Sequence, residues 1–208
     1  TILLDGGMGT MLQASGLKLG ARPEELNIEN PALIESIHGM YAAAGSRIVN
    51  ANTFGASAHK LADSKYSLEE IIAAGIGCCK RACAPYGALT ALDVGPLGEL
   101  LEPSGTLAFE DALNEYARIV RAGVSAGADL IFFETFTDLY ELKAALLAAK
   151  ENSTLPVLAS MSFEAGGRAF TGCTVESFGV TARGLGADAV GINCSLGPKE
   201  IFPMAKRL

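Results

Sequence analysis

The sequence predicts an α/β protein of the (β/α)8 TIM barrel class. Short apolar segments alternate along the chain with longer amphipathic or alanine-rich segments. The apolar segments are mostly continuous runs, which is typical of parallel strands that are buried on both faces. Polar residues follow nearly every run. The carboxyl ends of barrel strands meet at one mouth, whereas an open doubly wound sheet has its site at one switch point. The pattern therefore favours a barrel.

Six segments have the composition of such strands. They are Ile2–Asp5, Arg47–Phe54, Ala88–Val94, Leu130–Thr135, Val157–Phe163 and Ala189–Ser195. A complete barrel usually needs about 250 residues, and this chain has 208. We therefore expect one barrel domain over residues 1–208, truncated after about six βα units, with its C-terminal part missing.

The segments between the strands carry helix signals. Asn30 followed by Pro31 is typical of a helix start, and Gly45 of a helix stop. Apolar residues recur near a 3.6-residue period over Phe109–Val124, and a final helix is expected over Lys199–Leu208.

Two further helix starts have the spacing of a capping box, in which the first residue and the residue three positions later exchange hydrogen bonds with each other's backbone. Ser67 with Glu70 predicts one, and Asp138 with Glu141 predicts a similar start.

Composition excludes several classes of function. The net charge is -7 and no stretch is rich in Lys and Arg, so we expect no nucleic-acid or anionic-membrane partner. The apolar run at Ala128–Phe133 is far shorter than the ~18 residues that span a bilayer. The chain begins TILLDGG, without a basic segment followed by an apolar one, so we expect no signal peptide. Five cysteines are an odd number in a chain too large to need disulfides, so reduced thiols and a cytoplasmic location are expected.

Two carboxylates stand at predicted strand ends. Asp5 opens a glycine-rich turn in which Gly6 and Gly7 free the backbone to present N–H groups to an anion such as a carboxylate. Glu134 follows four apolar residues, where a carboxylate is costly unless it is paired. Together they suggest a site for a cationic group. The alternatives are a plain glycine-rich turn at Asp5 and a structural salt bridge at Glu134.

The cysteines divide into two groups. Cys194 lies at a strand end, where a thiolate could be a nucleophile or a metal ligand, although a buried cysteine is also common as a small apolar residue. Cys78, Cys79 and Cys83 fall in a predicted helix, with Cys79 and Cys83 on one face, and no nearby Cys or His completes a zinc spacing. Core packing is the better interpretation for these three.

Five motifs at strand ends carry a resemblance to a known family. They are DGGMGT at residues 5–10, NTFG at Asn52–Gly55, GPLG at Gly95–Gly98, FETF at Phe133–Phe136 and GINCSLGP at Gly191–Pro198. In this order they resemble the homocysteine S-methyltransferases. With Pro23–Asn27, the resemblance is closest to the N-terminal homocysteine module of cobalamin-dependent methionine synthase. It covers essentially the whole chain.

The resemblance implies a barrel whose mouth holds zinc on three cysteine thiolates. Cys194 would be one ligand and a catalytic residue. The other two belong to a Gly-Gly-Cys-Cys-Gly motif that is absent here and is expected beyond Leu208, so the zinc site of this chain is incomplete. Cobalamin would be a cofactor of the parent protein.

The resemblance also assigns the substrate contacts. The backbone of Gly6 and Gly7 would hold the homocysteine carboxylate, and Asp5 and Glu134 its ammonium group. Asn52 and Asn193 would shape the site.

The function implied is zinc-dependent methyl transfer to the thiol of homocysteine, giving methionine, as part of 5-methyltetrahydrofolate–homocysteine methyltransferase. The partner besides homocysteine is a methyl-donor module or small molecule. Within the family, betaine or S-methylmethionine could be the donor instead. A metal-independent lyase or aldolase using Glu134 as base is disfavoured, because no lysine stands at a strand end. The non-enzyme alternative is an amino-acid-binding fragment.

Overall fold

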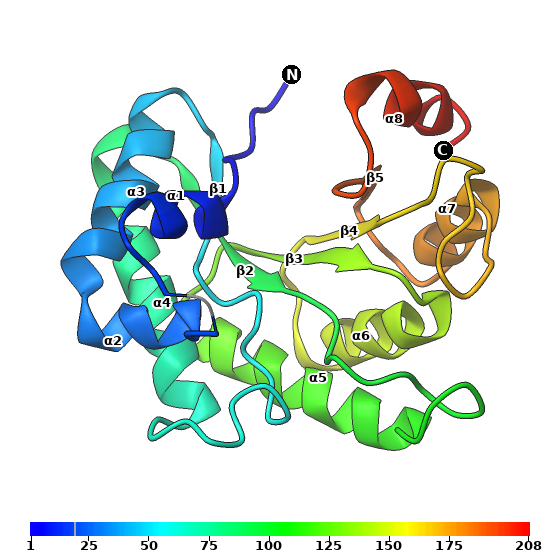
Figure 1. Cartoon of the computed structure of the whole chain (residues 1–208), viewed down its shortest axis with the longest axis horizontal. Helices are drawn as coiled ribbons and strands as arrows, with labels where there is room; N and C mark the ends of the chain where they lie inside the picture. Colours follow the sequence, from blue (N-terminus) through cyan, green and yellow to red (C-terminus); the bar gives the residue numbers. More distant parts are fainter. Residues whose placement is uncertain (19) are drawn as a thin grey trace. The chain divides into compact units, whose positions relative to one another are not determined.

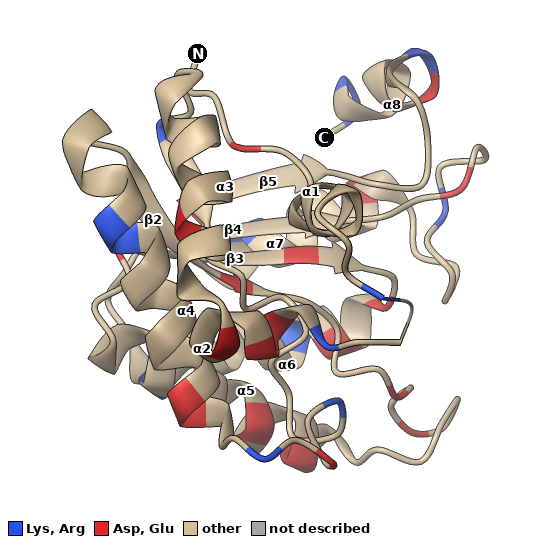
Figure 2. Cartoon of the chain, turned by 60° about the vertical axis from the view of Figure 1, so that its left-hand side comes forward, with Lys and Arg blue, Asp and Glu red and all other residues tan. Residues whose placement is uncertain are grey.

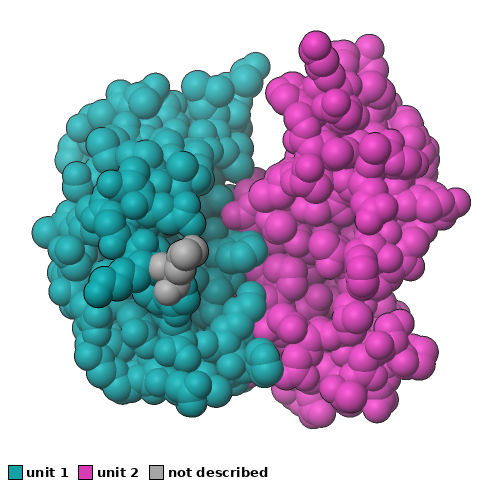
Figure 3. All heavy atoms as spheres, viewed as in Figure 1, with its two compact units in different colours: residues 1–94, 121–130 teal, residues 95–120, 131–208 magenta. Residues whose placement is uncertain are grey.

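The computed structural model describes residues 1–18 and 20–208, which divide into two compact units (Figure 3). Unit 1 comprises Thr1–Val94 and Arg121–Leu130, and unit 2 comprises Gly95–Val120 and Ile131–Leu208. The single barrel domain expected over residues 1–208 stays a prediction, and each unit is described by itself.

Unit 1 contains two parallel strands and the helices around them. β1 (Ile48–Asn50) pairs with β2 (Leu89–Val94), with Ile48 opposite Leu89. The helices of this unit are α1 (Met8–Ala14), α2 (Leu26–Glu29), α3 (Pro31–Ala43) and α4 (Leu68–Cys83), with short 3-10 turns η1 (Pro23–Glu25) and η2 (Ala84–Tyr86). α3 and α4 lie side by side (Figure 1).

Unit 2 contains three parallel strands in chain order. β3 (Leu130–Phe136) pairs with β4 (Val157–Met161), and β4 pairs with β5 (Ala189–Ile192). The helices of this unit are α6 (Leu139–Asn152), α7 (Val175–Gly184), α8 (Pro198–Ala205) and α5 (Phe109–Ser125) as far as Val120. The predicted α/β fold with parallel strands is therefore confirmed, although every strand except β3 is shorter than the sequence indicated.

The first predicted strand is the main departure. Over Ile2–Asp5 the structure has one isolated parallel bridge, between Leu4 and Ile48, and no strand. Ile2 and Leu3 are 64% and 56% exposed. The apolar pattern was correct, but a strand also needs a continuous ladder of backbone hydrogen bonds, and the bonds here are those donated by Arg47 and Ile48 to the Leu3 carbonyl.

Both predicted helix starts are confirmed, but only the one at Ser67 has both hydrogen bonds of a capping box. Ser67 and Glu70 form the predicted capping box of α4. At α6, Asp138 accepts from the N–H of Tyr140. Glu141 turns away from that cap, is 3% exposed, and binds elsewhere in unit 2. The residue spacing is that of a capping box, but the Glu141 carboxylate accepts hydrogen bonds from buried donors instead of capping the helix.

Charge is kept off the strands. The five strands contain two ionisable residues, Asp93 in β2 and Glu134 in β3. Figure 2 shows the remaining charges on helices and loops. None of the described helices is long and apolar enough to cross a bilayer.

The core of unit 1 joins three helices. Leu12 of α1, Ile34 and Ile37 of α3, and Cys78 of α4 form one buried cluster. Cys79 and Cys83 are also buried, with their sulfur atoms 3.8 Å apart, and the hydrogen bond to Cys83, together with burial, raises the pKa of Cys79. The three helical cysteines therefore pack as small core residues, as their spacing indicated.

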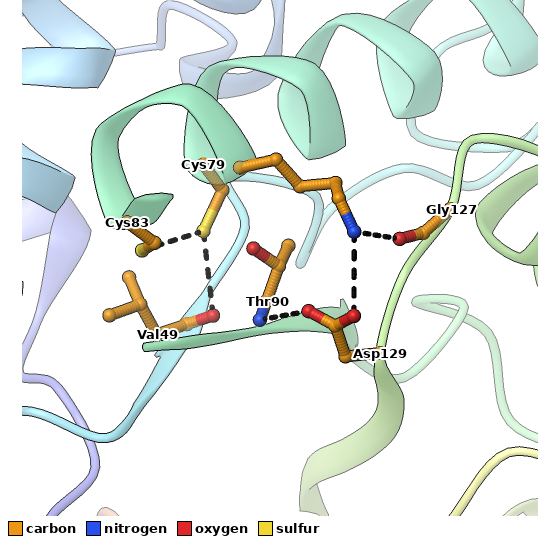
Figure 4. A network of polar contacts seen from close by, with 7 residues as sticks. Val49, Cys79, Cys83, Thr90, Gly127 and Asp129 are labelled. Carbon is orange, nitrogen blue, oxygen red and sulfur yellow. Dashed lines mark hydrogen bonds and ion pairs between the residues drawn. The ribbon is translucent and has the colours of Figure 1, made fainter. Parts of the chain in front are cut away.

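A polar network ties α4 to the strands beneath it (Figure 4). The Cys79 thiol lies 3.5 Å from the carbonyl oxygen of Val49 in β1. Lys80 of α4 donates to the Gly127 carbonyl at 2.6 Å and lies 3.4 Å from Asp129. Asp129 in turn accepts from the Thr90 N–H of β2 at 2.8 Å. Asp129, which interrupts an apolar run in the sequence, thus has a structural use.

Gly75 in α4 lies against the buried side chains of Asn27 and Thr53. A β-carbon there would lie 2.7 Å from Nδ2 of Asn27 and 2.9 Å from Cγ2 of Thr53. We expect Gly75→Ala to lower the free energy of unfolding by about 1–3 kcal/mol, because the clash outweighs the helix propensity gained. Gly39→Ala in α3, where a β-carbon meets nothing within 4 Å, should stabilise the chain. Urea unfolding of both variants checks this, and equal effects would contradict it.

His38 in α3 is fully buried, and neither ring nitrogen has a hydrogen-bond partner. Burial lowers its pKa from 6.5 to about 4, against a smaller opposing effect of Glu35. Between these two pKa values His38 is protonated in the unfolded chain but not in the folded chain. The free energy of unfolding therefore falls as the pH drops from about 6.5 to about 4.

We expect this loss to reach about 3 kcal/mol and to disappear in His38→Leu. Urea unfolding across that pH range measures it, with substitution of the exposed His59 by Gln as control. A pH dependence that is the same in wild type and His38→Leu would contradict the assignment.

Candidate functional site

In unit 2, Glu134 and Thr135 lie at an irregularity of β3. The pairing of β3 with β4 shifts register between Phe133 and Phe136. Such a bulge turns side chains out of their regular alternation. Glu134 and Thr135 are half-buried, while the residues on either side are buried. The bulge thus brings a carboxylate and a hydroxyl partly into solvent at the end of an otherwise buried strand.

Asn193, directly after β5, connects these residues. Its side-chain nitrogen donates to a carboxylate oxygen of Glu134 and, at 2.7 Å, to the hydroxyl oxygen of Thr135. Its side-chain oxygen accepts from the Thr135 N–H at 3.1 Å and from the Ser160 hydroxyl of β4 at 2.8 Å. The carbonyl of Asn193 accepts from the Ser162 hydroxyl. Glu134, Thr135 and Ser160 thus share the side-chain amide of Asn193, and Ser162 binds its backbone.

Cys194 is the exposed one of the chain's five cysteines, all of which are described. Its sulfur lies 3.5 Å from the Thr135 hydroxyl oxygen and 3.5 Å from the Asn193 side-chain nitrogen. The structure therefore brings together three of the predicted site residues, Glu134, Asn193 and Cys194. It adds Thr135, which the sequence analysis did not single out. The FETF motif was the available signal, since Thr135 is its third residue.

In unit 1, the glycine turn after Leu4 is held by two contacts. One carboxylate oxygen of Asp5 accepts from the N–H of Asn50 in β1 at 2.9 Å. The Tyr41 hydroxyl of α3 donates to the Gly7 carbonyl at 3.3 Å, and a β-carbon on Gly6 would lie 2.9 Å from the Tyr41 ring. Burial and the Asp5 carboxylate raise the pKa of Tyr41. Tyr41 is a second residue that the sequence did not single out, and it explains why position 6 is glycine.

Gly6 and Gly7 are exposed, and Gly7 is the N-cap of α1. No side chain caps this helix. The N–H groups of its first turn therefore lack an N-cap side chain as acceptor, which is an arrangement that suits an anion.

Asn52 is buried and hydrogen-bonded within unit 1, so it is not placed to contact a ligand. It is 5% exposed, and its side-chain nitrogen donates to the Pro23 carbonyl at 2.8 Å and to the Asn27 side-chain oxygen at 2.9 Å. Asn27 returns a bond to the Asn52 carbonyl. Nearby, the Glu24 carboxylate accepts from the N–H of Gly55. This network joins the PEELN and NTFG motifs, so both motifs serve the packing of unit 1.

The GPLG motif is held in unit 2 by Glu141. The N–H of Leu97 donates to one Glu141 oxygen at 2.7 Å, and the Tyr116 hydroxyl of α5 donates to the same oxygen at 2.8 Å. Burial, and next the charge of Glu141, raise the pKa of Tyr116. A buried carboxylate with these donors fixes the loop after β2 rather than capping α6.

The described residues do not make up the three-thiolate zinc site that the sequence resemblance implies. Over residues 1–18 and 20–208, no group of three or more His, Cys, Asp and Glu side chains is placed to hold a metal ion. Cys194 is accessible for such a role, whereas Cys78, Cys79 and Cys83 are buried in α4.

Comparison with known proteins agrees with the family resemblance of the sequence motifs. The family model of homocysteine S-methyltransferase matches residues 2–208. Methionine synthase of Mycobacterium tuberculosis is 30% identical over 222 residues, which cover 98% of this chain and 18% of that protein. Methionine synthase of Mycobacterium leprae is 29% identical over 225 residues, with the same shares. The chain thus spans less than a fifth of the length of these relatives.

Among solved structures, the chain is similar to the metallated form of the homocysteine methyltransferase MmuM of Escherichia coli. The TM-score is 0.84 at 23% identity, and the match covers 96% of this chain and 76% of that one. This likeness confirms the predicted barrel class of fold. The family itself follows from the match over residues 2–208: the chain belongs to the homocysteine S-methyltransferases.

Proposed function

We propose that this chain binds homocysteine as the acceptor of a methyl group in an enzyme of the methionine synthase type. The observation that carries the proposal is the Glu134 carboxylate, held by Asn193 in the same hydrogen-bonded group as the exposed thiol of Cys194. An amino acid with a thiol side chain needs an anion for its ammonium group and a thiophilic region for its sulfur. Family membership supports this match.

Glu134 is proposed to hold the ammonium group, with Asp5 as a second carboxylate and the N–H groups of Gly6 and Gly7 for the carboxylate of homocysteine. The uncapped first turn after Gly7 supports the last assignment. For Asn52 we propose a packing role instead, because both hydrogens of its amide are used within unit 1. Clamping both charged ends of the amino acid would orient its thiol for reaction.

Zinc dependence is proposed for the whole enzyme, with Cys194 as one ligand. A free alkyl thiol has a pKa near ~8.5 and is mostly protonated at neutral pH, so the family's metal would supply the thiolate. The described residues bind and orient the amino acid, and no contact of theirs completes that metal site. With methionine synthases as relatives, we propose methyltetrahydrofolate as the methyl source and cobalamin as a cofactor of the parent protein.

The competing proposal is an amino-acid-binding protein in which the clamp works without catalysis. It needs only the carboxylates and the glycine turn, and no metal ion. The two proposals differ in zinc. Homocysteine affinity that rises with bound zinc supports the methyltransferase, and affinity indifferent to zinc supports the binding protein.

The clamp predicts a specific pattern of affinities. Glu134→Gln and Asp5→Asn each remove a carboxylate and should each weaken homocysteine binding by about tenfold or more, since a hydrogen bond to a charged group is lost. Isothermal titration under reducing conditions measures this. Glu151→Gln, an exposed position of α6, serves as the control.

If both carboxylates contact one ammonium group, the double variant Asp5→Asn, Glu134→Gln should lose less than the two single losses combined. Strict additivity would mean that the two carboxylates act on different groups. Unchanged binding in both single variants would contradict the clamp.

Metal content is a separate prediction. We expect the 208-residue chain to bind zinc weakly and in less than one equivalent per chain, because one accessible thiol is too few for a structural-strength site. Mass spectrometry and metal analysis on one sample check this. Tight binding of one zinc, abolished by Cys194→Ser, would show that other residues of this chain complete the site.

A further inference from the structure

Three residues of the candidate site have a backbone conformation that side chains normally avoid. Thr135, Cys194 and Ser195 have φ of 62°, 56° and 58°, and over residues 1–18 and 20–208 they are the non-glycine residues with positive φ. The strain is greatest for Thr135, whose β-carbon is branched. Strained residues persist where surrounding contacts hold them. Thr135 and Cys194 therefore need a neighbouring group that holds their backbone in this conformation.

That group is the side-chain amide of Asn193. The bulge in β3 takes the Thr135 N–H out of the regular strand pairing, and this N–H donates to Asn193 Oδ1 at 3.1 Å. The Ser160 hydroxyl lies 2.8 Å from the same oxygen. A backbone N–H can only donate, so the atom facing it must be the amide oxygen. The orientation of the amide is thereby determined, and its nitrogen must face Glu134 and Thr135.

The remaining hydrogen bonds then have one direction. Asn193 Nδ2 donates to Glu134 and to Thr135 Oγ1. Because Thr135 Oγ1 accepts this bond, its own hydrogen can be donated to the Cys194 sulfur at 3.5 Å or to the Glu134 carboxylate at 3.4 Å. The chain of donors runs from Ser160 through Asn193 to Thr135 and ends on the two groups with proposed roles. Such chains polarise and strengthen one another.

We propose that Asn193 is a positioning residue that does not touch the substrate, and that with Thr135 it fixes the Glu134 carboxylate and the Cys194 thiol as one unit. This inference rests on the proposed function for the identity of the amino acid. It changes the role that the sequence resemblance assigns to Asn193, because each polar atom of the amide already has at least two partners within unit 2. It also adds Thr135 to the positioning residues.

Two variants of Asn193 separate the bonds of its amide. Asn193→Asp keeps an oxygen for the Thr135 N–H but places a second carboxylate against Glu134. Asn193→Leu, similar in size, removes all the bonds, and Asn193→Ala replaces it if the leucine variant does not fold. Asn152→Asp, the same charge change at the end of α6, is the matched control.

The first readout is hydrogen exchange of the Thr135 N–H, which needs no ligand. We expect exchange about tenfold or more faster in Asn193→Leu, with Asn193→Asp close to wild type. Equal protection in all three proteins would overturn the positioning of Thr135, whatever the chain binds.

The second readout is affinity for homocysteine and for 4-mercaptobutyrate, which lacks only the ammonium group. Positioning through Glu134 predicts that Asn193→Asp weakens homocysteine binding about tenfold or more and leaves 4-mercaptobutyrate unchanged. An equal loss for both ligands would mean that Asn193 contacts the ligand carboxylate, and would overturn the inference. Failure of the wild-type chain to bind homocysteine would instead refute the proposed function, while the exchange result would still decide the role of Asn193.

Discussion

A carboxylate at the end of a buried strand needs hydrogen-bond donors, and in this protein Asn193 supplies one to Glu134. The same amide receives the Thr135 N–H, which the bulge of β3 turns away from regular pairing. The partly exposed carboxylate, the strained backbone of Thr135 and the position of the Cys194 sulfur all depend on this one side chain. The proposed site, which needs a fixed anion near a thiol, thus lies at the end of β3 and directly after β5, where regular structure limits the movement of its side chains.

Two buried polar pairs, one in each unit, have the same role. Asn27 with Asn52 in unit 1, and Glu141 with Tyr116 in unit 2, each fix a motif that follows a strand. Because a half-satisfied buried amide or carboxylate is costly, these groups specify their loops closely. The motifs that identify the family therefore include residues that hold loops as well as residues suited to meet a ligand, and motif membership alone does not distinguish them.

Much of the fold could be predicted from sequence because it depends on local patterns. The later strands follow from apolar runs, and the start of α4 from the Ser67 and Glu70 spacing. The failures have a common physical cause, which is competition from residues distant in the chain. Glu141 has the spacing of a cap but binds Leu97 and Tyr116, and Ile2–Asp5 has the composition of a strand but little ladder. For the site, Glu134 and Cys194 could be found from their place at strand ends. The FETF motif includes Thr135 but does not reveal its role, and nothing in the sequence points to Tyr41, because the importance of both lies in contacts across 59 and 34 residues.

The central claim is that Glu134, oriented by Asn193, holds the ammonium group of homocysteine. The most direct test is an experimental structure of the chain with L-homocysteine bound under reducing conditions. The account predicts the ammonium nitrogen about 2.8 Å from a Glu134 carboxylate oxygen, with the Asn193 amide keeping its present partners. Homocysteine bound with its ammonium group away from Glu134, or with the Asn193 amide turned onto the ligand, would contradict it.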